Sequence, residues 1–105
     1  MNRRAVGLVA LGVDLALLAG IVGKVPPNTL RWETQSELDA FGYHVYRSGS
    51  KAGPFKRLTL DAVIAAGTTD VPQSYTYVDD AIEAGQQYWY YVETVKLTGE
   101  RERLT

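Results

Sequence analysis

Cysteine is absent from this chain of 105 residues, histidine occurs only once, and no serine lies in a nucleophile motif. The absence of cysteine excludes a disulfide framework and thiolate chemistry. With His44 as the single histidine, catalytic triads and zinc sites lack their parts. The sequence also contains no glycine-rich phosphate loop and no internal repeat. We therefore expect a protein that is not an enzyme and that carries no cofactor or metal.

An excess of positive charge is also missing. The chain has 11 basic and 12 acidic residues, and setting aside residues 1–24, with three basic and one acidic residue, leaves 8 against 11, or −3. Nucleic-acid binding needs clustered positive charge, so nucleic acid is not an expected partner. Hydrophobic residues make up 46% of the chain and charged residues 22%, which excludes a disordered or collagen-like chain and fits one small domain.

The N-terminus carries two arginines, then the apolar run Ala5–Gly23, whose only charge is Asp14, and then Lys24. Basic residues before a long apolar run are typical of a signal peptide or an uncleaved signal anchor. The sequence predicts such a helix over residues 1–24, followed by a proline-rich stalk over 25–28. The small-residue rule for a cleavage site is poorly met, so cleavage and retention both stay open. We expect a secreted, periplasmic or membrane-anchored protein whose domain lies outside the cytoplasm.

A helix over this segment would carry Gly12, Ala16 and Gly20 on one face, because these small residues recur every four positions. Such a stripe lets two membrane helices approach closely. Asp14 would add a polar contact to the partner helix, since carboxylates inside a membrane are usually paired. These four residues are the expected membrane-helix contact, and the alternative is a cleaved or passive anchor.

The aromatic run between Gly85 and Gly99 predicts a central β-strand. Side chains alternate along a strand, so one face would carry Tyr88, Tyr90, Val92 and Thr94, and the other Trp89, Tyr91, Glu93 and Val95. Alternation and turn residues predict five further strands, at about 29–33, 42–48, 55–58, 75–78 and 100–105. Residues 34–41 are expected to form a loop, and 59–74 a loosely structured crossing with one short helical turn. The predicted fold is therefore all-β, with about six strands.

Five motifs at this spacing resemble those of a fibronectin type III domain of the sort found in bacterial envelope and secreted proteins. In the family's letters they are Leu30-Arg-Trp32 on strand B, Gly42-Tyr-His-Val-Tyr-Arg47 on C, Gly53-Pro-Phe55 opening C′, Tyr75-Thr-Tyr-Val-Asp79 on E and Gly85-Gln-Gln-Tyr-Trp-Tyr-Tyr-Val92 on F. The resemblance covers residues 28–105 and implies an immunoglobulin-like sandwich of two sheets. No strand A is evident and the last strand is short. Three explanations stay open: residues 25–28 supply a stub, one sheet edge is open to another chain, or the chain is truncated.

The resemblance also implies where particular side chains lie. Tyr88 would form a tyrosine corner, its hydroxyl bonding to backbone near Ile82. Acidic residues in the two loops that join B to C and E to F would lie at opposite ends of the sandwich and share no calcium ion. We expect them to be solvated turn and capping carboxylates: Glu37, Asp39, Asp79 and Asp80. The residues expected between the sheets are Trp32, Tyr43, Val45, Tyr77, Tyr90 and Val92.

If those residues face inward, their neighbours on the same two strands face outward. His44, Tyr46, Trp89 and Tyr91 would then form one aromatic patch on the outer face of a sheet, a candidate binding site. The alternative is cross-strand packing in which the stems of Arg47, Lys56 or Arg57 cover the rings.

Three functional hypotheses follow. The resemblance implies a non-catalytic interaction or spacer module that binds another envelope protein. Surface aromatics favour a carbohydrate-binding accessory domain with a glycan as its partner, because sugar rings stack on Trp and Tyr. The small-residue stripe and Asp14 favour a small membrane-complex subunit held by its N-terminal helix.

Overall fold

Eight β-strands make up the fold in the computed structural model, which describes residues 8–15 and 25–104. All strand pairs are antiparallel, and the described residues contain no helix. The all-β prediction is therefore confirmed. The strands are β1 (Leu8–Leu15), β2 (Asn28–Thr34), β3 (Ala40–Ser48), β4 (Lys56–Arg57), β5 (Val63–Ile64), β6 (Gln73–Asp79), β7 (Trp89–Lys96) and β8 (Arg101–Leu104).

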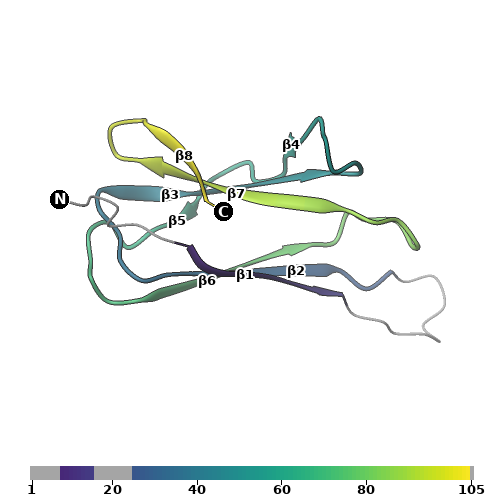
Figure 1. The fold of residues 1–105 in the computed structure, drawn as a ribbon, viewed down its shortest axis with the longest axis horizontal. Helices are drawn as coiled ribbons and strands as arrows, with labels where there is room; N and C mark the ends of the chain where they lie inside the picture. The colour runs from purple at the N-terminus through teal and green to yellow at the C-terminus, as the bar shows by residue number, and fades with distance from the viewer. Residues whose placement is uncertain (1–7, 16–24, 105) are drawn as a thin grey trace.

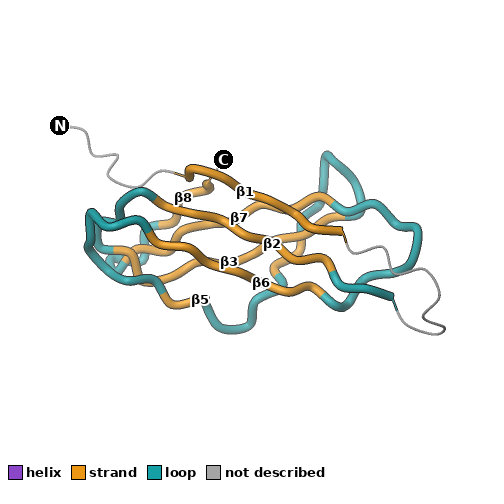
Figure 2. Tube along the Cα trace, turned by 90° about the horizontal axis from the view of Figure 1, so that it is seen from below, coloured by secondary structure: helices purple, strands orange, loops and turns teal. Residues whose placement is uncertain are grey.

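The strands form two sheets that lie one above the other (Figure 1). The first sheet has the order β1-β2-β6, and the second has the order β4-β3-β7-β8, with β5 also paired to β3. The six predicted strands correspond to β2, β3, β4, β6, β7 and β8. In both sheets the strands run along the long axis of the molecule (Figure 2).

Strand β7 is an interior strand of the second sheet, as its aromatic sequence predicted, with β3 on one side and β8 on the other. Glycines bound the segment that contains it. Gly85 and Gly99 have φ angles of 76° and 92°, in the left-handed region that glycine adopts without a steric penalty. The turn at Gly99 brings β8 back beside β7, so that Arg103 lies opposite Glu93.

The core lies between the two sheets and follows the predicted alternation. Leu30 and Trp32 on β2 face Tyr43 and Val45 on β3 and Val92 on β7, all at most 2% exposed. Tyr77 and Tyr90 are partly buried and pack against this cluster. The predicted core is confirmed, and β8 adds Leu104 to it.

Residues 8–15, the described part of the apolar N-terminal run, are extended, and the expected helix over 1–24 stays a prediction. Residues Leu8–Leu15 form β1, which pairs with β2 and occupies the position where no strand A was expected. Gly12 lies opposite Arg31 and Asp14 opposite Thr29 in this pairing. Ala16 and Gly20, and the rest of the expected helix at 1–7 and 16–24, lie outside the described residues. Within the described ranges, no helix is long and apolar enough to cross a membrane.

The crossing at residues 59–74 contains a short strand instead of the expected helical turn. Its apolar residues alternate: Val63 and Ala65 pack against the core, whereas Leu60 and Ile64 are 86% and 66% exposed. This period of two fits a strand, and β5 pairs with β3 at Tyr43 and Gly42. The expectation of a helical turn was wrong, because local apolar composition does not reveal pairing with a distant strand.

Gly42 is the residue that lets β5 approach β3. A Cβ atom at this position would lie 2.6 Å from the backbone oxygen of Val63 and 2.9 Å from Cβ of Ala62. We expect Gly42→Ala to lower the free energy of unfolding by about 1 to 3 kcal/mol, as overpacking does. Gly49→Ala is the matched control, because a Cβ there would meet only the end of the Gln86 side chain at 3.3 Å. Urea denaturation measures both, and equal losses in the two variants would contradict this account.

Candidate functional site

The outer face of the second sheet carries the aromatic side chains that the alternation predicted. Val45 and Val92 lie opposite each other and are fully buried, so the next pair along the strands, Tyr46 and Tyr91, points away from the core. Trp89 lies one further step along the same face, opposite Ser48. Trp89 and Tyr91 are half-buried and are not part of the cluster between the sheets. The predicted register of these strands is therefore confirmed.

Tyr46 and Tyr91 form a stacked pair at the centre of this face. Their ring centroids are 4.6 Å apart and their planes differ by 8°. Phe55 packs edge-on against Tyr91 at 5.1 Å. The guanidinium group of Arg103 lies over Tyr91, 4.0 Å from the ring centroid, and 5.9 Å from that of Phe55. We call Tyr46, Phe55, Tyr91 and Arg103 the aromatic row.

Glu93 links the aromatic row to strand β8 through hydrogen bonds. Its Oε1 accepts hydrogen bonds from the Tyr46 hydroxyl at 2.9 Å and from Arg101 Nη1 at 3.1 Å. Burial, together with the hydrogen bond to Glu93, raises the pKa of Tyr46. The hydroxyl of Tyr46 is thus held neutral, and Glu93 is engaged on two sides.

His44 lies on the same face but adds nothing to its exposed surface. It is 7% exposed, and its Nδ1 is 2.6 Å from Oγ1 of Thr59. Burial, and then the positive charges of Arg57 and Arg101, lower the pKa of His44, which favours the neutral imidazole. Of the four expected patch residues, Tyr46 and Tyr91 are in contact, Trp89 lies at the end of β7, and His44 is covered.

The cation that covers the rings is Arg103, not one of the three expected basic residues. The Arg47 side chain instead binds Asp79 and lies over the ring of Tyr88 at 4.9 Å. Arg103 and Phe55 are the residues that sequence reasoning missed. The alternation of Arg101 and Arg103 after the Gly99 turn is the signal that indicates two basic side chains on one face of β8.

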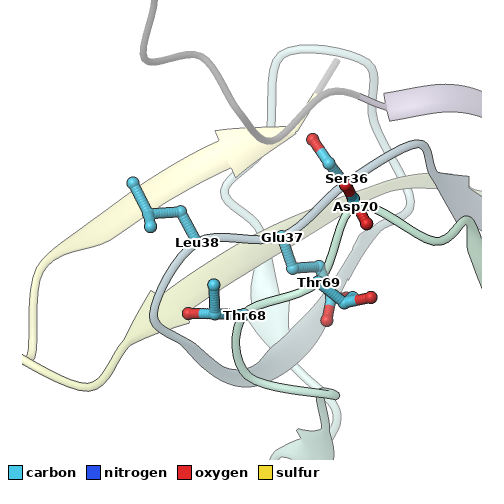
Figure 3. Close-up of a pocket in the computed structure, with 6 residues that line it drawn as sticks. All are labelled: Ser36, Glu37, Leu38, Thr68, Thr69 and Asp70. Atoms are coloured by element: carbon cyan, nitrogen blue, oxygen red, sulfur yellow. The ribbon is translucent and has the colours of Figure 1, made fainter.

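Glu37 is buried, although its polar loop predicted a solvated carboxylate. It is 2% exposed and accepts hydrogen bonds from the hydroxyls of Tyr43 (2.6 Å), Tyr75 and Thr34 (3.3 Å) at Oε2, and from the backbone N–H of Ala66 (2.9 Å) at Oε1. We call this group the Glu37 cluster. A shallow depression lies beside it, lined by Ser36, Glu37, Leu38, Thr68, Thr69 and Asp70 (Figure 3). Four hydrogen-bond donors already satisfy the Glu37 carboxylate, so its role is structural.

The Glu37 cluster predicts how the domain responds to alkali. Burial, followed by the hydrogen bond to Glu37, raises the pKa of Tyr75 to about 12, whereas a tyrosine in the unfolded chain ionises near pH 10. The stability that neutral Tyr75 contributes is therefore complete below about pH 10 and is lost between about pH 10 and about pH 12. We expect the free energy of unfolding of Tyr75→Phe to fall less steeply over this range than that of the unchanged chain. Urea denaturation at a series of pH values tests this, and identical slopes would contradict it.

A second polar cluster lies at the other end of the sandwich. Asp79, also expected to be solvated, is 3% exposed, and Arg47 Nη1 lies 2.9 Å from each of its carboxylate oxygens. The hydroxyl of Tyr90 donates to Asp79 Oδ2 at 2.7 Å and accepts from Asn28 Nδ2 at 2.8 Å. Burial lowers the pKa of Arg47, but the pairing with Asp79 outweighs it and raises that pKa. We call these four residues the Asp79 cluster.

Tyr88 takes the position that the resemblance implied for it. Its hydroxyl accepts a hydrogen bond of 3.0 Å from the backbone N–H of Glu83, the residue after Ile82. The bond joins the start of β7 to the segment that follows β6. Among the described residues, no group of three or more His, Asp or Glu side chains is placed to hold a metal ion.

Comparison of the chain with protein-family models, with curated proteins and with solved structures gave no match.

Proposed function

We propose that this protein is a non-catalytic interaction module with a fibronectin type III-like fold, exported to or anchored at a bacterial cell envelope. The order of the strands supports the fold. With the letters of the five motifs, and with A for β1 and G for β8, the first sheet is A-B-E and the second is C′-C-F-G. Immunoglobulin-like sandwiches divide A, B and E from C, F and G in the same way. The hydrogen bond between Tyr88 and Glu83 gives further support.

The observation that carries the interaction function is the partly exposed aromatic row on the outer face of the second sheet. Packing of the core does not explain these aromatic side chains. The core lies on the opposite face of the sheet, where Tyr43, Val45 and Val92 fill the space between the sheets. Tyr, Trp and Arg are the residues that most often dominate binding energy in protein interfaces. Stacking on the sheet also fixes Tyr46 and Tyr91 before a partner arrives, which lowers the entropy lost on binding.

The contacts within the row favour a protein partner over a glycan. A sugar ring needs a free aromatic face on which to stack. Tyr46 and Tyr91 each use one face on the other, and Arg103 covers the second face of Tyr91. Trp89 is the observation that favours the carbohydrate-binding alternative, because no ring or guanidinium group among the described residues contacts it.

A photo-crosslinking residue tests the interaction function directly. We expect the full chain with this residue at Trp89 to yield adducts of discrete mass in the producing cells. The same residue at Glu33, exposed on the first sheet, should yield none. The adducts from position 89 should be lost in Tyr46→Ala, which removes one ring of the stack. Adducts from both faces or from neither would overturn the proposed interaction surface.

Export rests on the basic and apolar N-terminal sequence, and it bears on strand β1. Residues 8–15 cannot be an edge strand and part of a membrane helix or a removed peptide at the same time. A reporter fused after Thr105 locates the domain, and the mass of the product shows whether residues 8–15 are retained. An intact chain that stays in the soluble cytoplasmic fraction would overturn export.

A further inference from the structure

The outer face of the second sheet is positively charged, although the domain is acidic. Three arginines stand on it: Arg57 lies opposite Tyr46, Arg103 opposite Glu93, and Arg101 opposite Val95. Side chains at directly opposed positions share a face. Two acidic side chains offset part of this charge: Glu93, which is engaged by Tyr46 and Arg101, and Asp61, whose charge acts on His44. Residues 25–105, by contrast, have 8 basic and 11 acidic side chains, so this face has a larger share of basic residues than the domain as a whole.

Strand β8 is the edge of this sheet, and it carries two of the three arginines. It pairs with β7 on one side, and within residues 8–15 and 25–104 no strand pairs with its other side. An unpaired edge can accept an extended segment of another chain through backbone hydrogen bonds. Arg101 and Arg103 are two residues apart and so point to the same face. An added strand would therefore place its alternate side chains beside them.

Both guanidinium groups keep donors free for a ligand. Arg101 contacts Glu93 through Nη1 alone, and arginine has five N–H donors. The Arg101 side chain is 49% exposed and Glu93 is 16% exposed, so the guanidinium group is open to a second carboxylate while it keeps its contact with Glu93. The guanidinium group of Arg103 lies over the Tyr91 ring and makes no hydrogen bond or ion pair with the other described residues, so its N–H donors are left for a carboxylate.

We propose that the partner is a protein segment in extended conformation, with carboxylates at alternate residues, that adds to the edge of β8. Its acidic side chains pair with Arg101 and Arg103, and its remaining side chains reach toward the aromatic row. The charge of this face selects an acidic segment, and the spacing of the two arginines selects the alternation. This inference rests on the proposed interaction function and names the chemistry of its partner.

The test uses the full chain and a short blocked peptide of alternating Glu and Thr. Fluorescence anisotropy gives the dissociation constant, and amide chemical shifts locate the peptide. We expect binding that shifts amides of β7 and β8 and weakens as salt is added. A peptide of the same composition with its glutamates grouped, and one with Gln in place of Glu, should bind much more weakly. Equal binding of the alternating and grouped peptides would overturn the spacing argument.

Matched variants separate specific pairing from net charge. The double change Arg101→Gln and Arg103→Gln should weaken binding by roughly tenfold or more, because two hydrogen-bonded charge pairs are lost. Arg31→Gln with Lys51→Gln removes the same charge elsewhere and should change the constant by less than about twofold. Arg101→Lys with Arg103→Lys keeps the charge without the fork and should bind with intermediate strength. Denaturation confirms that each variant is folded, and equal losses in the two Gln variants would overturn the proposal.

The outcomes distinguish this inference from the proposed function. Crosslinks from Trp89 with no binding of the acidic peptide would leave the interaction function standing and overturn the acidic partner. A sulfated oligosaccharide that binds as tightly as the peptide would overturn it in favour of a glycan. Self-association seen by sedimentation, and lost in the Arg101 and Arg103 double variant without peptide binding, would overturn it in favour of a second copy of the chain.

Discussion

Replacing Glu37 with alanine should lower the free energy of unfolding by on the order of 4 kcal/mol. The carboxylate accepts from Tyr43, Tyr75, Thr34 and the backbone of Ala66, and the alanine side chain accepts from none of them. Tyr43 is fully buried, so its hydroxyl would lose its charged acceptor and keep only the hydroxyls of Thr34 and Tyr75 as polar neighbours. A buried donor left in this state costs about 1 to 3 kcal/mol, and more than one is affected.

Two further variants show whether the loss comes from this cluster. Glu33→Ala removes a glutamate from the exposed side of β2, where it accepts one hydrogen bond from Ser74, and should cost less than about 0.5 kcal/mol. Glu37→Gln keeps the shape and one acceptor oxygen and should lie between the two. All three are measured by urea denaturation. If Glu37→Ala costs no more than Glu33→Ala, the carboxylate does not hold the cluster together.

The sequence was sufficient to predict the strands and the buried residues of the sandwich. Alternation is a local property, and burial on one face of β2 and β7 preserves it in the sequence. Trp32, Tyr43 and Val92 could therefore be placed in the core, and Tyr46 and Tyr91 outside it, before any contact was known. The contact between the last two follows from strand register alone.

Burial of the carboxylates could not be predicted in this way. Glu37 stands in a polar segment and Asp79 stands beside Asp80 at the end of a strand, and both settings favour solvated carboxylates. Their partners come from distant positions: Tyr75 is 38 residues from Glu37, and Arg47 is 32 residues from Asp79. A carboxylate becomes stable in a buried site only when such donors converge on it. The packing of both sheets sets that convergence, and no local pattern records it.

The same limit applies to strands β1 and β5 and to Arg103. The composition of an apolar run such as Ala5–Gly23 is compatible both with a membrane helix and with a strand at a sheet edge. Strand β5 exists because Gly42 leaves room for it on a neighbouring strand. The position of Arg103 over Tyr91 depends on how the Gly99 turn sets the register of β8. Each is decided by a contact between segments that are separate in the sequence.

The two polar clusters hold the sandwich at opposite ends. Asn28 pairs with Asp79 at one end of the β2 and β6 ladder, and Thr34 pairs with Gln73 at the other. The Asp79 cluster joins the first end to β3 and β7 through Arg47 and Tyr90, and the Glu37 cluster joins the second end to β3 through Tyr43. Hydrogen bonds between the sheets are directional, whereas the apolar core is not. We infer that the clusters fix the relative position of the two sheets, and with it the geometry of the outer face.

Asp79→Ala should therefore cost about 3 kcal/mol, because it leaves the Arg47 charge, 17% exposed, without its partner. It also removes the acceptor of the Tyr90 hydroxyl. The neighbouring Asp80→Ala is the matched control, since Asp80 is exposed, and should change stability by less than about 0.5 kcal/mol. Urea denaturation of both variants gives the comparison.

A double-mutant cycle with Arg47→Leu separates the ion pair from the rest of the cluster. Once Asp79 is alanine, Arg47→Leu should cost little or restore stability, because an apolar side chain then replaces a buried and unpaired charge. The sum of the stability losses in the two single variants should thus exceed the loss in the double variant by more than about 1 kcal/mol. If the losses are simply additive, Arg47 and Asp79 contribute independently. The pair would then not be what joins β3 in the second sheet to β6 in the first.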